Sequence, residues 1–170
     1  MTYRPLILAL AMLAACQSDP APPAPPAPPA SATVQPEAPR FEVGEGIGPV
    51  RLGMTREDLE RLGLPLEERS HDLVVGAYRV MLEGERVTFI EVQLAELPQG
   101  LVVGDHRVAP EERDITAIAK HLPGCGEMEM LTGGNVITCE GGTVTVAAAG
   151  PPGIVQLQLM TTTSAAFRLR

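Results

Sequence analysis

Aromatic residues and lysine are nearly absent from this chain of 170 residues. It has no tryptophan, two tyrosines and three phenylalanines. The core must therefore be aliphatic, and a carbohydrate site, which usually stacks sugar rings on aromatic side chains, is disfavoured. Lys120 is the only lysine, and 21 Asp and Glu residues outnumber 13 Lys and Arg residues. Because nucleic-acid phosphates are neutralised by clustered Lys and Arg, we expect no nucleic-acid partner.

Recognisable catalytic and metal-binding motifs are also missing. The sequence contains no Gly-x-Ser-x-Gly, no Ser-x-x-Lys and no phosphate-binding glycine loop before a helix. His71, His106 and His121 are not paired at the spacing of metal ligands. Acidic residues near His106 could gather around an ion, but solvated loop residues are the favoured interpretation. We therefore expect a protein that is not an enzyme and that has no metal site and no cofactor.

No apolar run reaches the roughly 20 residues that a membrane-spanning helix needs. The run over residues 5–15 is shorter, follows Arg4 and ends in small residues, which is the layout of a secretory signal. Leu13-Ala14-Ala15-Cys16 resembles the lipobox of bacterial lipoproteins. The resemblance implies that residues 1–15 are removed and that Cys16 is lipidated. The alternative is an ordinary secreted protein with a chance cysteine at its cleavage site.

The lipobox resemblance implies attachment to a membrane through the lipid. A single acyl chain holds a protein only marginally, at about 0.8 kcal/mol per buried CH₂, whereas lipoproteins of this type carry three chains. Gln17 stands where an aspartate would retain the protein at the inner membrane. We therefore expect a lipid-anchored envelope protein of the outer membrane that faces the periplasm.

Two further cysteines, Cys125 and Cys139, remain after the lipidated one. In an oxidising compartment an even pair indicates a disulfide, and closing a loop of about 15 residues contributes roughly 3 kcal/mol. A buried pair of free thiols is the alternative. Because no Cys-x-x-Cys occurs, redox catalysis is disfavoured.

A proline-rich tract separates the lipidated end from the rest of the chain. Residues 20–39 contain nine prolines, most of them among alanines, and such sequences form extended polyproline II spacers. At ~3.1 Å per residue, the tract could hold a domain up to roughly 60 Å from the lipid. We predict a linker over residues 16–40 and one globular domain over residues 41–170.

Two short helices are predicted within this domain. Thr55 is a good N-cap and Asp58 stands at the capping-box position, so the first helix should cover residues 55–62. The second should begin at Pro110, which is followed by two glutamates. It should end before Pro123, because proline cannot continue a helix.

Alternation of apolar and polar residues predicts several strands. They cover residues 78–82, 87–94, 128–131, 135–140, 143–149 and 154–160, with residues 101–108 also extended. By this alternation Met128 and Met130 should point inward, whereas Glu91 and Glu96 should lie on a solvated sheet face. The sequence thus predicts an α+β fold: a small antiparallel sheet with two short helices, in a tandem helix-then-hairpin repeat.

The first predicted helix carries a recognisable sequence. Gly53-Met54-Thr55-Arg56-Glu57-Asp58-Leu59, followed by Leu62-Gly63 and Pro65, resembles an element of the SmpA/OmlA lipoproteins, which are accessories of the β-barrel assembly machinery. The likeness covers about residues 50–94. In outline the chain is also similar to the β-lactamase inhibitory proteins, which are built from two helix-plus-sheet repeats. These resemblances imply an α+β fold in an envelope setting.

A long uncharged stretch, residues 141–167, has two interpretations. The favoured one is a pair of buried strands with an outer face of Thr and Gln. The other is an uncharged sheet surface that receives a partner, with polar contacts from Gln156, Gln158 and residues 161–163.

Two functions remain after these exclusions. We expect a non-enzymatic binding or scaffold module that docks another envelope protein. The alternative is an inhibitor or sensor of a periplasmic hydrolase, which would insert residues 128–134 into its target. The candidate binding residues are Met128, Met130, Gly133, Gln156 and Gln158.

Overall fold

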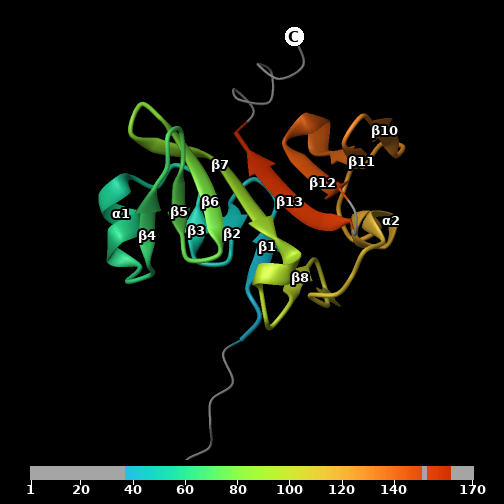
Figure 1. Ribbon diagram of the computed structural model, residues 1–170, viewed down its shortest axis with the longest axis horizontal. Helices are drawn as coiled ribbons and strands as arrows, with labels where there is room; N and C mark the ends of the chain where they lie inside the picture. Colours follow the sequence, from blue (N-terminus) through green and yellow to red (C-terminus); the bar gives the residue numbers. More distant parts are fainter. Residues whose placement is uncertain (1–36, 151–152, 162–170) are drawn as a thin grey trace, which may run out of the picture. The chain divides into compact units, whose positions relative to one another are not determined.

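The computed structural model describes residues 37–150 and 153–161, and it shows two repeats of one element order (Figure 1). Each repeat contains a small hairpin, a short helix and a four-stranded antiparallel meander. This confirms the predicted α+β class and tandem arrangement, although the first meander has two more strands than predicted. The signal sequence, Cys16 and residues 17–36 of the linker lie outside the described residues.

The first repeat begins one residue before the predicted domain boundary. Its elements are β1 (Arg40–Glu42), β2 (Gly46–Ile47), β3 (Val50–Arg51), α1 (Arg56–Arg61), β4 (Leu66–Glu68), β5 (Leu73–Val75), β6 (Tyr78–Glu83), β7 (Arg86–Gln93) and the 3₁₀ turn η1 (Leu94–Glu96). The second repeat contains β8 (Leu101–Val103), β9 (His106–Val108), α2 (Ile115–Ala119), β10 (Glu129–Leu131), β11 (Gly134–Cys139), η2 (Glu140–Gly142), β12 (Val144–Ala149) and β13 (Ile154–Met160). The predicted extended stretch 101–108 is therefore the hairpin β8–β9.

The two meanders join in one eight-stranded antiparallel sheet with the order β10-β11-β12-β13-β7-β6-β5-β4. Their last strands pair at its centre, where Leu157 lies opposite Val92. A five-stranded sheet has the order β3-β2-β1-β8-β9, and its β1 and β8 run parallel. The two repeats therefore contact each other in both sheets, through an antiparallel pair in the large sheet and a parallel pair in the small one.

One face of the eight-stranded sheet packs against the helices and the small sheet. Leu59 from α1, Ile118 from α2 and Val103 from β8 are buried in one apolar cluster with the inward residues of the strands. Because successive side chains of a strand point to opposite faces, the other face carries a separate set of residues. We call it the open face, because neither the helices nor the small sheet packs against it.

Helix α1 has the predicted capping box. Thr55 Oγ1 accepts a hydrogen bond from the Asp58 N–H at 3.3 Å, and Asp58 Oδ2 accepts one from the Thr55 N–H at 3.0 Å. The hydrogen bonds from the Thr55 N–H and then its hydroxyl lower the pKa of Asp58. A lowered carboxyl pKa stabilises the fold above the pKa of an unfolded aspartate, and this contribution is lost as pH falls through the folded value.

Replacing Thr55 by alanine should lower the free energy of unfolding by about 1 kcal/mol, because the Asp58 N–H loses its acceptor. Thr116, an exposed residue within α2, gives a matched control, and its replacement by alanine should change stability by less than about 0.5 kcal/mol. Urea denaturation monitored by circular dichroism measures both variants. Equal losses in the two would contradict the capping assignment.

The predicted start of the second helix is wrong. Helix α2 begins at Ile115 rather than at Pro110, because the Asp114 carboxylate caps it by accepting from the N–H groups of Thr116 and Ala117 at 2.9 and 3.2 Å. The preceding residues form a separate turn, in which the Glu112 carboxylate accepts from two N–H groups.

Candidate functional site

A hollow lies on the open face of the second meander. Its volume is about 560 Å³, and small residues of β11 and β12 form most of its floor. The residues that line it are Glu129, Leu131, Gly133, Gly134, Asn135, Val136, Thr138, Gly142, Thr145, Ala147, Ala148, Ala149, Gln158 and Met160. Only Glu129 among them is charged, so the hollow offers an almost uncharged concave surface.

Large apolar side chains are exposed in the second meander and in the loop before it. Met128, Met130 and Leu131 are 49%, 84% and 60% exposed, and Ile154 is also exposed. The prediction that Met128 and Met130 are inward is therefore wrong. Helix α2 packs against β11 and β12, whereas β10 is the outermost strand of the sheet, so its side chains lie beyond the elements that bury the core.

The middle of the open face holds a buried carboxylate. Glu91 is only 6% exposed, which corrects its prediction as a solvated residue. Glu96 is exposed as predicted, but it lies in the 3₁₀ turn η1 rather than on a sheet face. Gln158 Nε2 donates to Glu91 Oε2 at 2.8 Å, and Arg79 Nη1 lies 3.5 Å from Glu91 Oε1. Arg79 also donates to the Asp72 carboxylate, which raises the pKa of Arg79. Residues from the two strands beside β7, Arg79 of β6 and Gln158 of β13, thus hold Glu91 in place.

Replacing Glu91 by alanine should destabilise the fold by about 1–3 kcal/mol, because the Gln158 amide loses its acceptor. Glu91→Gln keeps the length of the side chain and an acceptor oxygen, so its cost should be smaller. Urea denaturation of the two variants gives the order. A glutamine variant as unstable as the alanine variant would show that charge, rather than the hydrogen bond, is what matters here.

The structure brings most of the predicted binding residues to one region. Gly133 and Gln158 line the hollow, whereas Met128 and Met130 are exposed but are not among its lining residues. Gln156 is on the open face too, but it lines a neighbouring depression of about 330 Å³ with Arg79 and Glu91. Of the predicted contacts at residues 161–163, only Thr161 is among the described residues.

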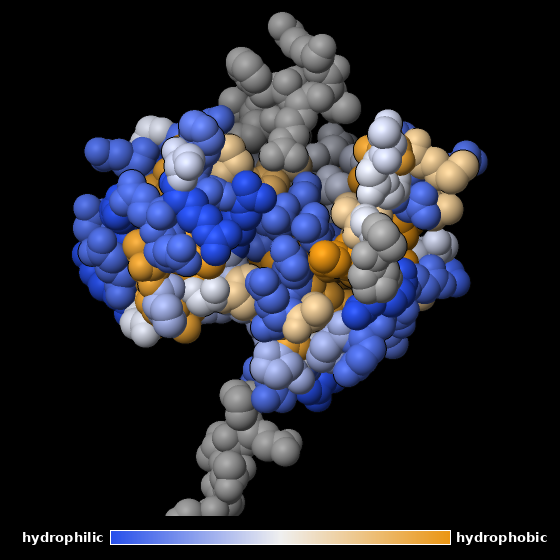
Figure 2. Space-filling view, in the orientation of Figure 1, coloured by the Kyte–Doolittle hydropathy of each residue, from blue (hydrophilic) through white to orange (hydrophobic). Residues whose placement is uncertain are grey.

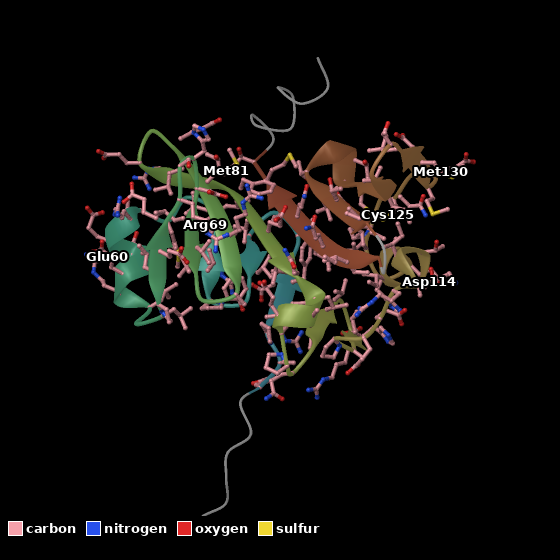
Figure 3. The ribbon with its side chains drawn as sticks, in the orientation of Figure 1. Glu60, Arg69, Met81, Asp114, Cys125 and Met130 are labelled. Atoms are coloured by element: carbon pink, nitrogen blue, oxygen red, sulfur yellow. A yellow bond between two sulfur atoms is a disulfide. The ribbon has the colours of Figure 1, made fainter. Side chains whose placement is uncertain are left out.

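Cys125 and Cys139 form the predicted disulfide, which ties the loop after α2 to β11 (Figure 3). Gly126 donates to the Thr138 carbonyl at 2.9 Å, whereas Glu129 pairs with Val136. The register therefore shifts by one residue between Gly126 and Glu129, as in a β-bulge. The disulfide thus fastens the β10–β11 hairpin close to its base.

The histidines form no comparable binding site in the described part of the chain. The rings of His106 and His121 stack with centroids 4.2 Å apart, and both residues are exposed. Within residues 37–150 and 153–161, no three His, Cys, Asp or Glu side chains are grouped so that they could hold a metal ion. A search of the same residues finds no helix with the length and apolar character needed to cross a membrane.

The sequence alone did not identify the hollow. The sequence feature that could have indicated it is the alternation of small residues along β11 and β12, where Val136, Thr138, Thr145 and Ala147 occupy the open face.

Comparison of the chain with protein-family models, with curated proteins and with solved structures finds no match. The resemblances to the lipoproteins and to the inhibitory proteins stay predictions.

Proposed function

We propose that this chain is a lipid-anchored module of the bacterial envelope that docks another envelope protein and is not itself an enzyme. The observation that carries the proposal is the almost uncharged hollow, whose lining includes the exposed side chain of Leu131. Contiguous apolar surface is uncommon on proteins that act alone, and it is typical of binding sites. Figure 2 shows hydrophilic side chains over the β4 end of the sheet and more hydrophobic ones toward β10.

The location in the proposal comes from the N-terminal sequence. The apolar segment before Cys16 supports export and lipidation, and Gln17 supports the outer membrane. The proline-rich tract would place the domain away from the lipid and toward a periplasmic partner. The disulfide fits an oxidising compartment.

The test is capture of a partner by the full lipidated chain from detergent-solubilised envelopes. One stoichiometric envelope protein should bind, and Ala147→Arg, which puts a long charged side chain on the floor of the hollow, should abolish binding. Thr116→Arg adds the same side chain to an exposed position of α2 and should leave binding intact. Capture that is equal with both variants would contradict docking through the hollow.

The second candidate function is inhibition or sensing of a periplasmic hydrolase. It is favoured by the exposure of Met128, Met130 and Leu131 on a hairpin that the disulfide fastens. Such a hairpin is preorganised for insertion into a cleft, which lowers the entropic cost of binding. Capture of a soluble hydrolase rather than a membrane-associated protein would decide for this function.

A further inference from the structure

The two edge strands of the eight-stranded sheet, β4 and β10, begin their meanders at equivalent positions but differ in side chains. On β4, Glu68 pairs with Arg56 at 2.9 Å and Glu67 with Arg69 at 3.5 Å. Proteins protect edge strands with charged side chains of this kind, because the free N–H and C=O groups of an edge can pair with another strand. The β4 edge is protected in this way.

The β10 edge carries a single charged side chain, Glu129, and among the described residues no ion pair involves this strand. Met130 projects from it into solvent (Figure 3), and Leu131 is exposed beside it. Among the described residues, β11 is the only strand paired with β10. The outer N–H and C=O groups of β10 are therefore available to a further strand.

The segment that contains β10 carries charge of one sign. From residue 121 to residue 161 the sequence contains no Lys or Arg, and its only charged residues are Glu127, Glu129 and Glu140. All three glutamates are exposed, and the ion pairs within the described residues leave them out. A strand that docks here meets carboxylates and apolar side chains of this segment, which itself contributes no Lys or Arg.

We propose that β10 is a docking edge for an extended segment of the partner protein in which basic and apolar residues alternate. The inference rests on the proposed docking function and names the chemistry of the segment that docks. Glu129 and Leu131 face the hollow, and Met130 points to the opposite side. Because alternate side chains of a strand point to opposite faces, a ninth strand of this pattern would place a Lys or Arg beside Glu129 on the hollow side and an apolar side chain beside Met130 on the other side.

Charge favours a basic partner over a second copy of this chain. Pairing of two β10 strands would add the Glu127 and Glu129 of a second copy to an edge that already carries both, with no Lys or Arg from this segment, and like charges across strands are destabilising. A basic segment neutralises the same carboxylates.

The test uses the full chain in a zwitterionic detergent and a peptide of alternating Lys and Val. Its controls are a Glu–Val peptide and a Lys–Val peptide whose alternate amides are N-methylated. Hydrogen exchange should slow at least tenfold over residues 129–131 with the Lys–Val peptide only. Equal slowing by all three peptides, or none at β10, would overturn the proposal, as would concentration-dependent pairing of β10 with a second copy.

Glu129→Lys should weaken binding of the Lys–Val peptide at least tenfold, whereas Glu111→Lys, an exposed position before α2, should not. Unchanged binding by Glu129→Lys would overturn the proposal.

The same variants distinguish a failure of the β10 docking edge from a failure of the proposed docking function. A partner lost with Ala147→Arg but kept with Glu129→Lys leaves the docking function standing and rejects the β10 edge. Peptide binding at β10 without any captured envelope protein would support the β10 edge and contradict the proposed docking function.

Discussion

Replacing Leu157 by alanine is expected to lower the free energy of unfolding by about 2–5 kcal/mol. Leu157 is fully buried on β13 and lies opposite Val92 of β7, where the two meanders join. Removing its side chain leaves a cavity at the junction of the repeats, which cannot collapse without shifting both strands. Urea denaturation followed by circular dichroism measures the loss.

The neighbouring Gln156 gives the control for this prediction. It lies on the same strand but on the open face, half-buried, so Gln156→Ala should cost far less than Leu157→Ala. A single transition in both variants is expected, since the sheet is continuous across the repeats. Two separate transitions in Leu157→Ala would show that the repeats fold independently and would contradict a shared core.

Loss of the disulfide is the second large effect that we expect. Cys125 and Cys139 are 14 residues apart in sequence, and the chain-entropy estimate gives about 3 kcal/mol for a loop of this length. Replacing both by alanine should lower stability by roughly that amount. Dithiothreitol should lower the stability of the natural protein similarly and leave the double variant unchanged.

The double variant also separates the two candidate functions. If the protein docks through the hollow, partner binding should survive wherever the variant is folded, because Ala147 and Thr145 lie on β12, which the disulfide does not join, and β11 stays paired with β12 along its length. An inhibitor that inserts the β10–β11 hairpin should lose affinity even when fully folded. Binding measured well below the unfolding midpoint gives the answer.

The sequence predicted those helices and strands that are determined by residues close together in the chain. Thr55 and Asp58 are three residues apart, so the capping box was visible, and β11 to β13 were recognised from alternation and glycine turns. The start of α2 was missed because Pro110 and Asp114 are both good helix-start signals. Only the hydrogen bonds of Asp114 decided between them.

Burial set by distant residues could not be read from the sequence. Alternation put Glu91 on the correct face, but Arg79 and Gln158 from neighbouring strands bury it. For Met130 alternation indicated a face, and the strand order then left that face uncovered at the β10 edge. The hollow likewise depends on the register of β11 against β12, which brings small residues together.

Site-specific photocrosslinking in intact cells tests the central claim most directly. A photoreactive residue at Thr138, which is exposed and lines the hollow, should give one major adduct with an envelope protein. The same residue at Glu111, on the loop before α2, should not give that adduct. A shared adduct from both positions, or none from Thr138, would contradict docking of a partner through the open face.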